Sequence, residues 1–124
     1  MKKHSQGFID LAEEAKSRIK ETNIEAVKKM VEDNDDVVII DVREESEWEQ
    51  GHLPNAIHLS KGVIERDIEK AVYDRNQKLV LYCGGGFRSA LAADNLQKMG
   101  YTKVLSMDGG FTAWKESGFS IEEN

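Results

Sequence analysis

Short apolar runs alternate with amphipathic segments along most of the chain. Two unbroken runs, at residues 37–40 and 79–82, are rich in Val, Ile and Leu. Such runs are typical of strands that are covered on both faces. Two weaker runs, at residues 56–59 and 103–106, lie next to turn-forming residues. We predict that these are strands as well.

Segments with helical spacing of apolar residues precede and separate these strands. The first covers residues 8–20, and a capping box formed by Thr22 and Glu25 predicts the start of a second helix. Further helices are predicted at residues 63–73, 89–99 and 110–117. Because strands alternate with helices, we expect an α/β fold in three layers, with a parallel sheet between two layers of helices.

The length of 124 residues is typical of one domain, so we expect a single core. The apolar stripe of the first helix could face a partner or the domain itself. We favour the domain, and expect residues 1–21 to pack on a domain formed by residues 22–124. No apolar run approaches the roughly 18 residues that cross a bilayer, and the basic start leads into no apolar signal core. These features predict a cytoplasmic protein.

Charge and cysteine content exclude several classes of function. The chain has 17 Lys and Arg against 23 Asp and Glu, a net charge of −6, which repels nucleic acid and anionic lipid. We therefore expect neither a nucleic-acid partner nor a membrane partner. The single cysteine, Cys83, can form no internal disulfide and no metal site made of several thiolates. Any functional role of Cys83 would therefore depend on the chemical reactivity of its thiol.

Cys83 directly follows the predicted strand at residues 79–82 and precedes three glycines, Phe87, Arg88 and a helical pattern. Ligands bind beyond the carboxyl ends of the strands in open parallel sheets. Glycines let successive amides turn inward around an anion, and the amino end of the following helix adds a favourable dipole. With the charge of Arg88, these groups favour the thiolate of Cys83, which is a strong nucleophile.

Two other interpretations of this segment are weaker. An isolated cysteine is often a small buried hydrophobe, but that role does not explain the glycines and the arginine that follow Cys83. The Gly84-x-Gly86 spacing could belong to a dinucleotide-binding loop, but Ser89 stands where that motif needs its third glycine. We therefore interpret the segment as the loop of a nucleophilic cysteine.

Three separated blocks of sequence resemble the rhodanese-like sulfurtransferase family, in particular its stand-alone single-domain type. The blocks are residues 40–44 with Trp48 and residues 51–56; residues 82–89; and residues 108–114 with residues 118–119. The resemblance implies a five-stranded parallel sheet and a sulfane sulfur carried on Cys83 as a persulfide. It further implies that Cys83 and Arg88 are catalytic and that the loop surrounds the sulfur. The substrate-binding residues would be Gly84, Gly85, Gly86, Phe87, Arg88 and Ser89.

Four further side chains in or beside this loop have structural as well as functional interpretations. Asp41 and Arg43 end a predicted strand, and we expect this pair to hold the neighbouring loops rather than to take part in the chemistry. Phe87 could pack inward or form the rim of the pocket. Ser89 could cap the following helix or hydrogen-bond the sulfur, and we favour the cap.

These expectations combine into a sulfurtransferase that needs no metal and no organic cofactor. Its donor would be a small sulfur-containing anion such as thiosulfate, and its acceptor cyanide, a thiol or a protein sulfur. We expect a monomer or a weak homodimer. One alternative is a cysteine-dependent phosphatase or arsenate reductase. The related loops of those enzymes resemble one another in having five residues between the cysteine and the arginine. In this chain, four residues lie between Cys83 and Arg88. The other is a non-enzymatic binding module, which would not need an activated thiol.

Overall fold

A computed structural model of the chain describes residues 4–123. Within them, five parallel strands form one sheet in the order β1-β5-β4-β2-β3. The strands are β1 (Lys20–Thr22), β2 (Val38–Asp41), β3 (Ile57–His58), β4 (Leu79–Tyr82) and β5 (Val104–Met107). The predicted α/β fold with a five-stranded parallel sheet is confirmed.

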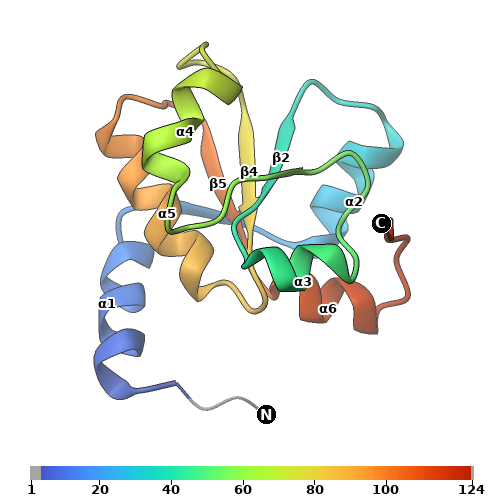
Figure 1. Cartoon of the computed structure of the whole chain (residues 1–124), viewed down its shortest axis with the longest axis horizontal. Helices are drawn as coiled ribbons and strands as arrows, with labels where there is room; N and C mark the ends of the chain where they lie inside the picture. Colours follow the sequence, from blue (N-terminus) through green and yellow to red (C-terminus); the bar gives the residue numbers. More distant parts are fainter. Residues whose placement is uncertain (1–3, 124) are drawn as a thin grey trace.

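Helices cover both faces of the sheet (Figure 1). They are α1 (Gln6–Lys16), α2 (Ile24–Glu32), α3 (Glu45–Glu49), α4 (Ile64–Ala71), α5 (Phe87–Lys98) and α6 (Gly110–Glu116). One face carries α4 and α5, with α1 outside α5, whereas α2 and α6 cover the other face. Across the described part of the chain, no helix combines the length and the apolar character needed to cross a membrane.

Alternate residues of the central strands contribute to two separate cores. Ile40 packs with Ile64 and Ile68 of α4 in one core. Its neighbour Ile39 points to the opposite face and joins the core that contains Val27 and Trp114. Because burial of one such aliphatic side chain is worth about 1.5–3 kcal/mol, these two layers fix which face of the sheet each helix covers.

Two elements of the structure are not predicted from the sequence, and two helices begin at residues other than the predicted ones. Residues 20–22 form the edge strand β1, although residue 20 was predicted to end the first helix and residue 22 to begin the second. Their polar sequence Lys-Glu-Thr gives no strand signal. The five-residue helix α3 was not predicted. The second helix has Asn23 as its N-cap instead of Thr22. Helix α5 begins at Phe87, two residues before the predicted start, because Gly86 caps it with a left-handed backbone.

Helix α1 lies against α5. Ala12 and Ala15 of α1 are buried, and Arg18, just after the helix, forms a 2.8 Å ion pair with Asp94 of α5. Burial of small residues lets the two helix backbones approach closely. Residues 1–3 of the predicted N-terminal unit, and residue 124 of the predicted domain, lie outside the described residues.

Candidate active site

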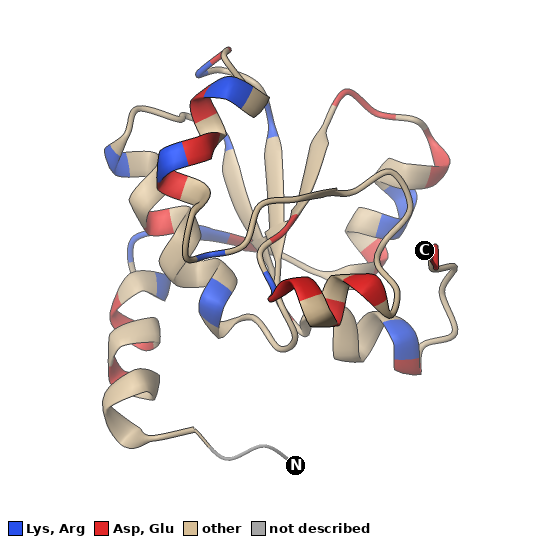
Figure 2. Ribbon diagram, in the orientation of Figure 1, with Lys and Arg blue, Asp and Glu red and all other residues tan. Residues whose placement is uncertain are grey.

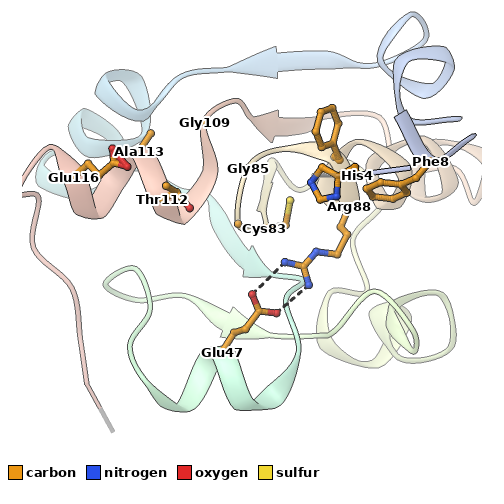
Figure 3. A pocket seen from close by; sticks show the side chains of 12 residues that line it. His4, Phe8, Glu47, Cys83, Gly85, Arg88, Gly109, Thr112, Ala113 and Glu116 are labelled. Atoms are coloured by element: carbon orange, nitrogen blue, oxygen red, sulfur yellow. Dashed lines mark hydrogen bonds and ion pairs between the residues drawn. The ribbon is translucent and has the colours of Figure 1, made fainter. Parts of the chain in front are cut away.

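Cys83 lies immediately beyond the carboxyl end of β4, at the base of a cavity of about 860 Å³ (Figure 3). The residue is only 1% exposed. The amide of Gly86 donates a hydrogen bond to the Cys83 sulfur at 3.0 Å, and the amide of Ser89 approaches it at 3.5 Å. These N–H groups belong to the first turn of α5 and its cap, so partial positive charge points at the sulfur.

The three glycines of the loop differ in backbone conformation and in the space that surrounds each of them. Gly86 has a φ of 111°, a left-handed conformation that turns its amide toward the sulfur. A Cβ on Gly84 would lie 3.4 Å from Nη2 of Arg88, an ordinary contact distance, so the guanidinium lies close to this position without requiring glycine there. A Cβ on Gly85 would meet no atom within 4 Å. The three glycines, which look equivalent in the sequence, differ in the structure: only Gly86 has the left-handed conformation.

Gly110, at the start of α6, lets this helix pack closely against the backbone of the loop at Cys83 and Gly84. Its φ is 57°, and a Cβ there would lie 2.5 Å from the carbonyl oxygen of Cys83 and 2.6 Å from that of Gly84. This close approach lets the next two amides of α6 donate to the same carbonyls, Phe111 to Cys83 at 2.8 Å and Thr112 to Gly84 at 3.1 Å. This role of Gly110 is not predicted from the sequence, because the Gly-Gly pair at residues 109–110 indicates only a helix start.

Arg88 points from α5 toward α3 and forms a two-bond ion pair with Glu47 (Figure 3). The distances are 2.9 and 3.2 Å. Hydrogen bonds from Arg88 lower the pKa of Glu47 to about 2, and the same bonds raise the pKa of Arg88, to which the nearby Cys83 also contributes. The resemblance implied a guanidinium around the sulfur, whereas here it faces Glu47. Glu47 was missed because it lies among several acids on α3 (Figure 2).

Ser89 lies in the first turn of α5 and is fully buried. It does not cap the helix, since Gly86 occupies that position. The Cys83 thiol donates to its hydroxyl at 3.6 Å, and the same hydroxyl is hydrogen-bonded to the hydroxyl of Ser106 at 2.8 Å. The buried Ser106 of β5 therefore orients the group that contacts the sulfur, a role that is not predicted from the sequence.

Asp41 and Arg43 form a buried ion pair beside the site. The guanidinium of Arg43 lies 2.7 Å from a carboxylate oxygen of Asp41 and donates to the carbonyl of Gly51 at 2.7 Å. Its central carbon also lies 4.1 Å from the ring centroid of Phe111. These contacts join the end of β2 to the loop at Gly51 and to α6. We propose that the pair positions these segments and does not contact the reacting sulfur.

One wall of the cavity is aromatic. Phe87, which could have packed inward, lines the cavity with His4 and Phe8 from the N-terminal segment. His4 and Phe8 are not predicted as site residues, because nothing in the sequence places residues 4–8 near residue 87. Thr112, Ala113 and Glu116 of α6 line the cavity elsewhere. Within residues 4–123, no three His, Cys, Asp or Glu side chains are grouped in a way that could hold a metal ion.

The chain is similar in sequence to known bacterial proteins. Thiosulfate sulfurtransferase GlpE of Coxiella burnetii is 39% identical over 80 residues, which are 64% of this chain and 73% of that protein. The putative sulfur carrier protein YrkF of Bacillus subtilis is 33% identical over 98 residues, 79% of this chain, which spans only about half (52%) of that relative.

A solved structure from Rhodopseudomonas palustris, of a protein of unknown function named as a possible tyrosine phosphatase, matches with a TM-score of 0.87 and 32% identity. The match covers 98% of both chains. Residues 23–117 match the model of the Rhodanese-like domain family, and this region contains Cys83, Arg88 and Glu47. The chain therefore belongs to the rhodanese-like domain family.

Proposed function

We propose that this protein is a sulfurtransferase that moves a sulfane sulfur from a donor such as thiosulfate to cyanide or a thiol, through a persulfide on Cys83. The observation that carries the proposal is the environment of the Cys83 sulfur. It receives the amide of Gly86 at 3.0 Å, lies beside the amide of Ser89 at 3.5 Å, and lines a cavity. Aligned N–H groups stabilise a thiolate and the terminal sulfur of a persulfide.

The reaction consists of two balanced displacements. The Cys83 thiolate attacks the outer sulfur of thiosulfate, a new S–S bond forms, the S–S bond of the donor breaks, and its electron pair leaves with sulfite. Cyanide or a thiolate then attacks the outer sulfur of the persulfide, and the electron pair of that S–S bond returns to Cys83. The transfer needs no external oxidant, because the outer sulfur enters and leaves the protein at the sulfane level in both displacements.

Arg88 lines the same cavity as Cys83 and contributes positive charge to it. Its guanidinium passes over Gly84 and is fixed by Glu47. A guanidinium held in a fixed position on the cavity wall stabilises the charge of the donor and of the departing sulfite. We propose that Cys83 and Arg88 are catalytic and that the amides of Gly84, Gly85, Gly86, Phe87 and Ser89 surround the transferred sulfur.

A cysteine-dependent phosphatase is the second candidate, and the name of the Rhodopseudomonas palustris neighbour favours it. The loop argues for sulfur transfer instead. Only four residues separate Cys83 from Arg88. The amides of Gly86 and Ser89 lie directly against the Cys83 sulfur. A phosphate with oxygens projecting from phosphorus needs a wider ring of amides than one terminal sulfur does.

Steady-state kinetics separate the two candidates. We expect transfer of sulfur from thiosulfate to cyanide with ping-pong kinetics, because the persulfide forms before the acceptor reacts. We expect the wild-type protein to hydrolyse aryl phosphates no faster than the Cys83→Ser variant does. Phosphatase turnover that depends on Cys83, together with no sulfur transfer from any of several donors, would replace the proposal with the second candidate.

A further inference from the structure

We propose that the aromatic wall formed by His4, Phe8 and Phe87 makes this site selective for sulfane sulfur carried on an apolar, ring-sized organic group. The inference rests on the proposed sulfur transfer and names the class of substrate. Phe8 of α1 is the specificity-determining residue. It lines the same cavity as Cys83 but belongs to a helix that precedes residues 23–117, the region matched by the family model.

The three rings form one packed cluster. The ring centroids of His4 and Phe8 lie 5.0 Å apart, those of His4 and Phe87 5.1 Å, and those of Phe8 and Phe87 5.9 Å. All three pairs meet edge to face, which is a favourable geometry for aromatic side chains. Figure 3 shows His4 and Phe8 grouped next to Arg88 on one side of Cys83, with Thr112 on the other side.

The wall has a fixed position relative to the sulfur. Phe87 begins α5 and directly precedes Arg88, so its ring is held by the same turn that cradles Cys83. The Lys16 ammonium lies 4.7 Å from the ring centroid of Phe87, a cation–π contact between α1 and α5. The ion pair of Arg18 with Asp94 also holds α1 on α5. Phe8 is therefore part of a preformed surface.

The size of the cavity exceeds what an inorganic donor needs. Its volume of about 860 Å³ falls in the range of about 300–1,000 Å³ that is common for sites of organic ligands. Thiosulfate at Cys83 would leave the aromatic wall in contact with water. An organic donor with its terminal sulfur on Cys83 has space to place its carbon group against Phe8, which removes apolar surface from water.

The charges around the cavity favour an uncharged carbon group. The positive charge of Arg88 is compensated by Glu47, and Glu116 adds a second carboxylate to the lining. A donor with further negative charges on its organic part would meet the carboxylate of Glu116. A neutral ring needs no ionic partner and matches the rings of His4 and Phe8.

Two thiosulfonates provide matched probes. In benzenethiosulfonate and methanethiosulfonate, the same –SO₂–S⁻ group is joined to a ring or to a methyl group. The Cys83 thiolate attacks the outer sulfur of either donor, the S–S bond of the donor breaks, and its electron pair leaves with the sulfinate. The reaction yields the Cys83 persulfide and balances without another reactant. The ratio of the two kcat/KM values, divided by the same ratio for a small thiolate in solution, reports the contribution of the wall.

We expect this corrected ratio to favour the ring by about tenfold, which corresponds to about 1.4 kcal/mol of aromatic contact. Phe8→Ala should lower the ratio to near one. Phe8→Leu, which keeps apolar volume and helps the helix to stay packed, should lower it partly. Leu11→Ala is the matched control, since Leu11 is on the same helix, is 55% exposed and does not line the cavity. It should leave the ratio unchanged.

The outcomes distinguish the two proposals. Persulfidation of Cys83 by thiosulfate and by both thiosulfonates, with a corrected ratio near one in the wild-type protein, would overturn the selectivity and leave sulfur transfer intact. A high ratio that persists in both Phe8→Ala and Phe8→Leu would likewise overturn the role of Phe8. Failure of all donors to persulfidate Cys83 would instead contradict the proposed function, on which the selectivity depends.

Discussion

The carboxylate of Glu47 accepts one hydrogen bond from each terminal nitrogen of Arg88, at 2.9 and 3.2 Å, although the two residues are 41 positions apart in the chain. Glu47 is on α3 and Arg88 in the first turn of α5, so the pair bridges two segments that enclose the cavity. Two parallel bonds fix the plane of a guanidinium as well as its position. Arg88 is thus oriented before a donor arrives.

Replacement of Glu47 by Gln should separate binding from chemistry. The variant leaves the positive charge of Arg88 uncompensated, so we expect the KM for thiosulfate to fall. It also removes the two-bond ion pair that fixes the guanidinium, so Arg88 no longer stabilises departing sulfite from a fixed position. We therefore expect kcat to fall by about tenfold. Steady-state kinetics at constant ionic strength provide the measurement. Glu49→Gln, on the exposed side of α3, should change neither constant. A raised KM in Glu47→Gln would contradict this account.

The same ion pair predicts how stability depends on pH. Arg88 lowers the pKa of Glu47 from its ordinary value of 4.5 to about 2. A carboxyl group with a lowered pKa in the folded state stabilises that state fully above its unfolded pKa, and this contribution is lost as the pH falls through the folded pKa. The difference in unfolding free energy between wild type and Glu47→Gln should therefore be constant above about pH 5 and shrink between about pH 4.5 and 2. Urea unfolding at a series of pH values, followed by tryptophan fluorescence, measures it. A difference that grows as the pH falls would refute the assignment.

Gly110 provides a test of the contact between α6 and the loop. In Gly110→Ala, the added Cβ meets the carbonyl oxygens of Cys83 and Gly84, and the residue also needs a left-handed backbone. We expect a loss of about 2–4 kcal/mol in stability and a larger proportional loss of sulfur transfer, because the loop must shift. Gly62→Ala is the control, since its Cβ would meet no atom within 4 Å. Thermal unfolding and kinetics of both variants give the comparison, and equal behaviour of the two would show that the close approach does not matter.

A substitution of Ser106 tests the hydrogen bond between the hydroxyls of Ser89 and Ser106. Ser106→Ala removes the partner of the buried Ser89 hydroxyl, and the loss of such a hydrogen bond costs about 1 kcal/mol. Because Ser89 then has more freedom to rotate, we also expect slower alkylation of Cys83 by iodoacetamide. Ser46→Ala, at an exposed position of α3, should leave both quantities unchanged. An alkylation rate equal to that of the wild type would exclude a positioning role for Ser106.

The sequence predicted those parts of the molecule that rest on local signals. The runs at residues 79–82 and 37–40 are apolar because they are central strands, and the loop after Cys83 follows directly from one of them. The edge strand β1 escaped prediction, because its residues are held by backbone bonds to β5 and bury little apolar surface. Glu47, Ser106, Gly110 and Phe8 were missed for a related reason. Each acts through a contact with a residue distant in the chain, and one sequence does not show which distant side chains meet.

Intact-mass measurement of the protein after incubation with thiosulfate tests the central claim most directly. Cys83 is the only thiol, so a single added sulfur reports its persulfide. We predict a mass increase of one sulfur atom in the wild-type protein, its removal by cyanide with formation of thiocyanate, and no increase in Cys83→Ser. An adduct that persists in Cys83→Ser, or the absence of any adduct with thiosulfate and with organic persulfide donors, would contradict sulfur transfer through Cys83.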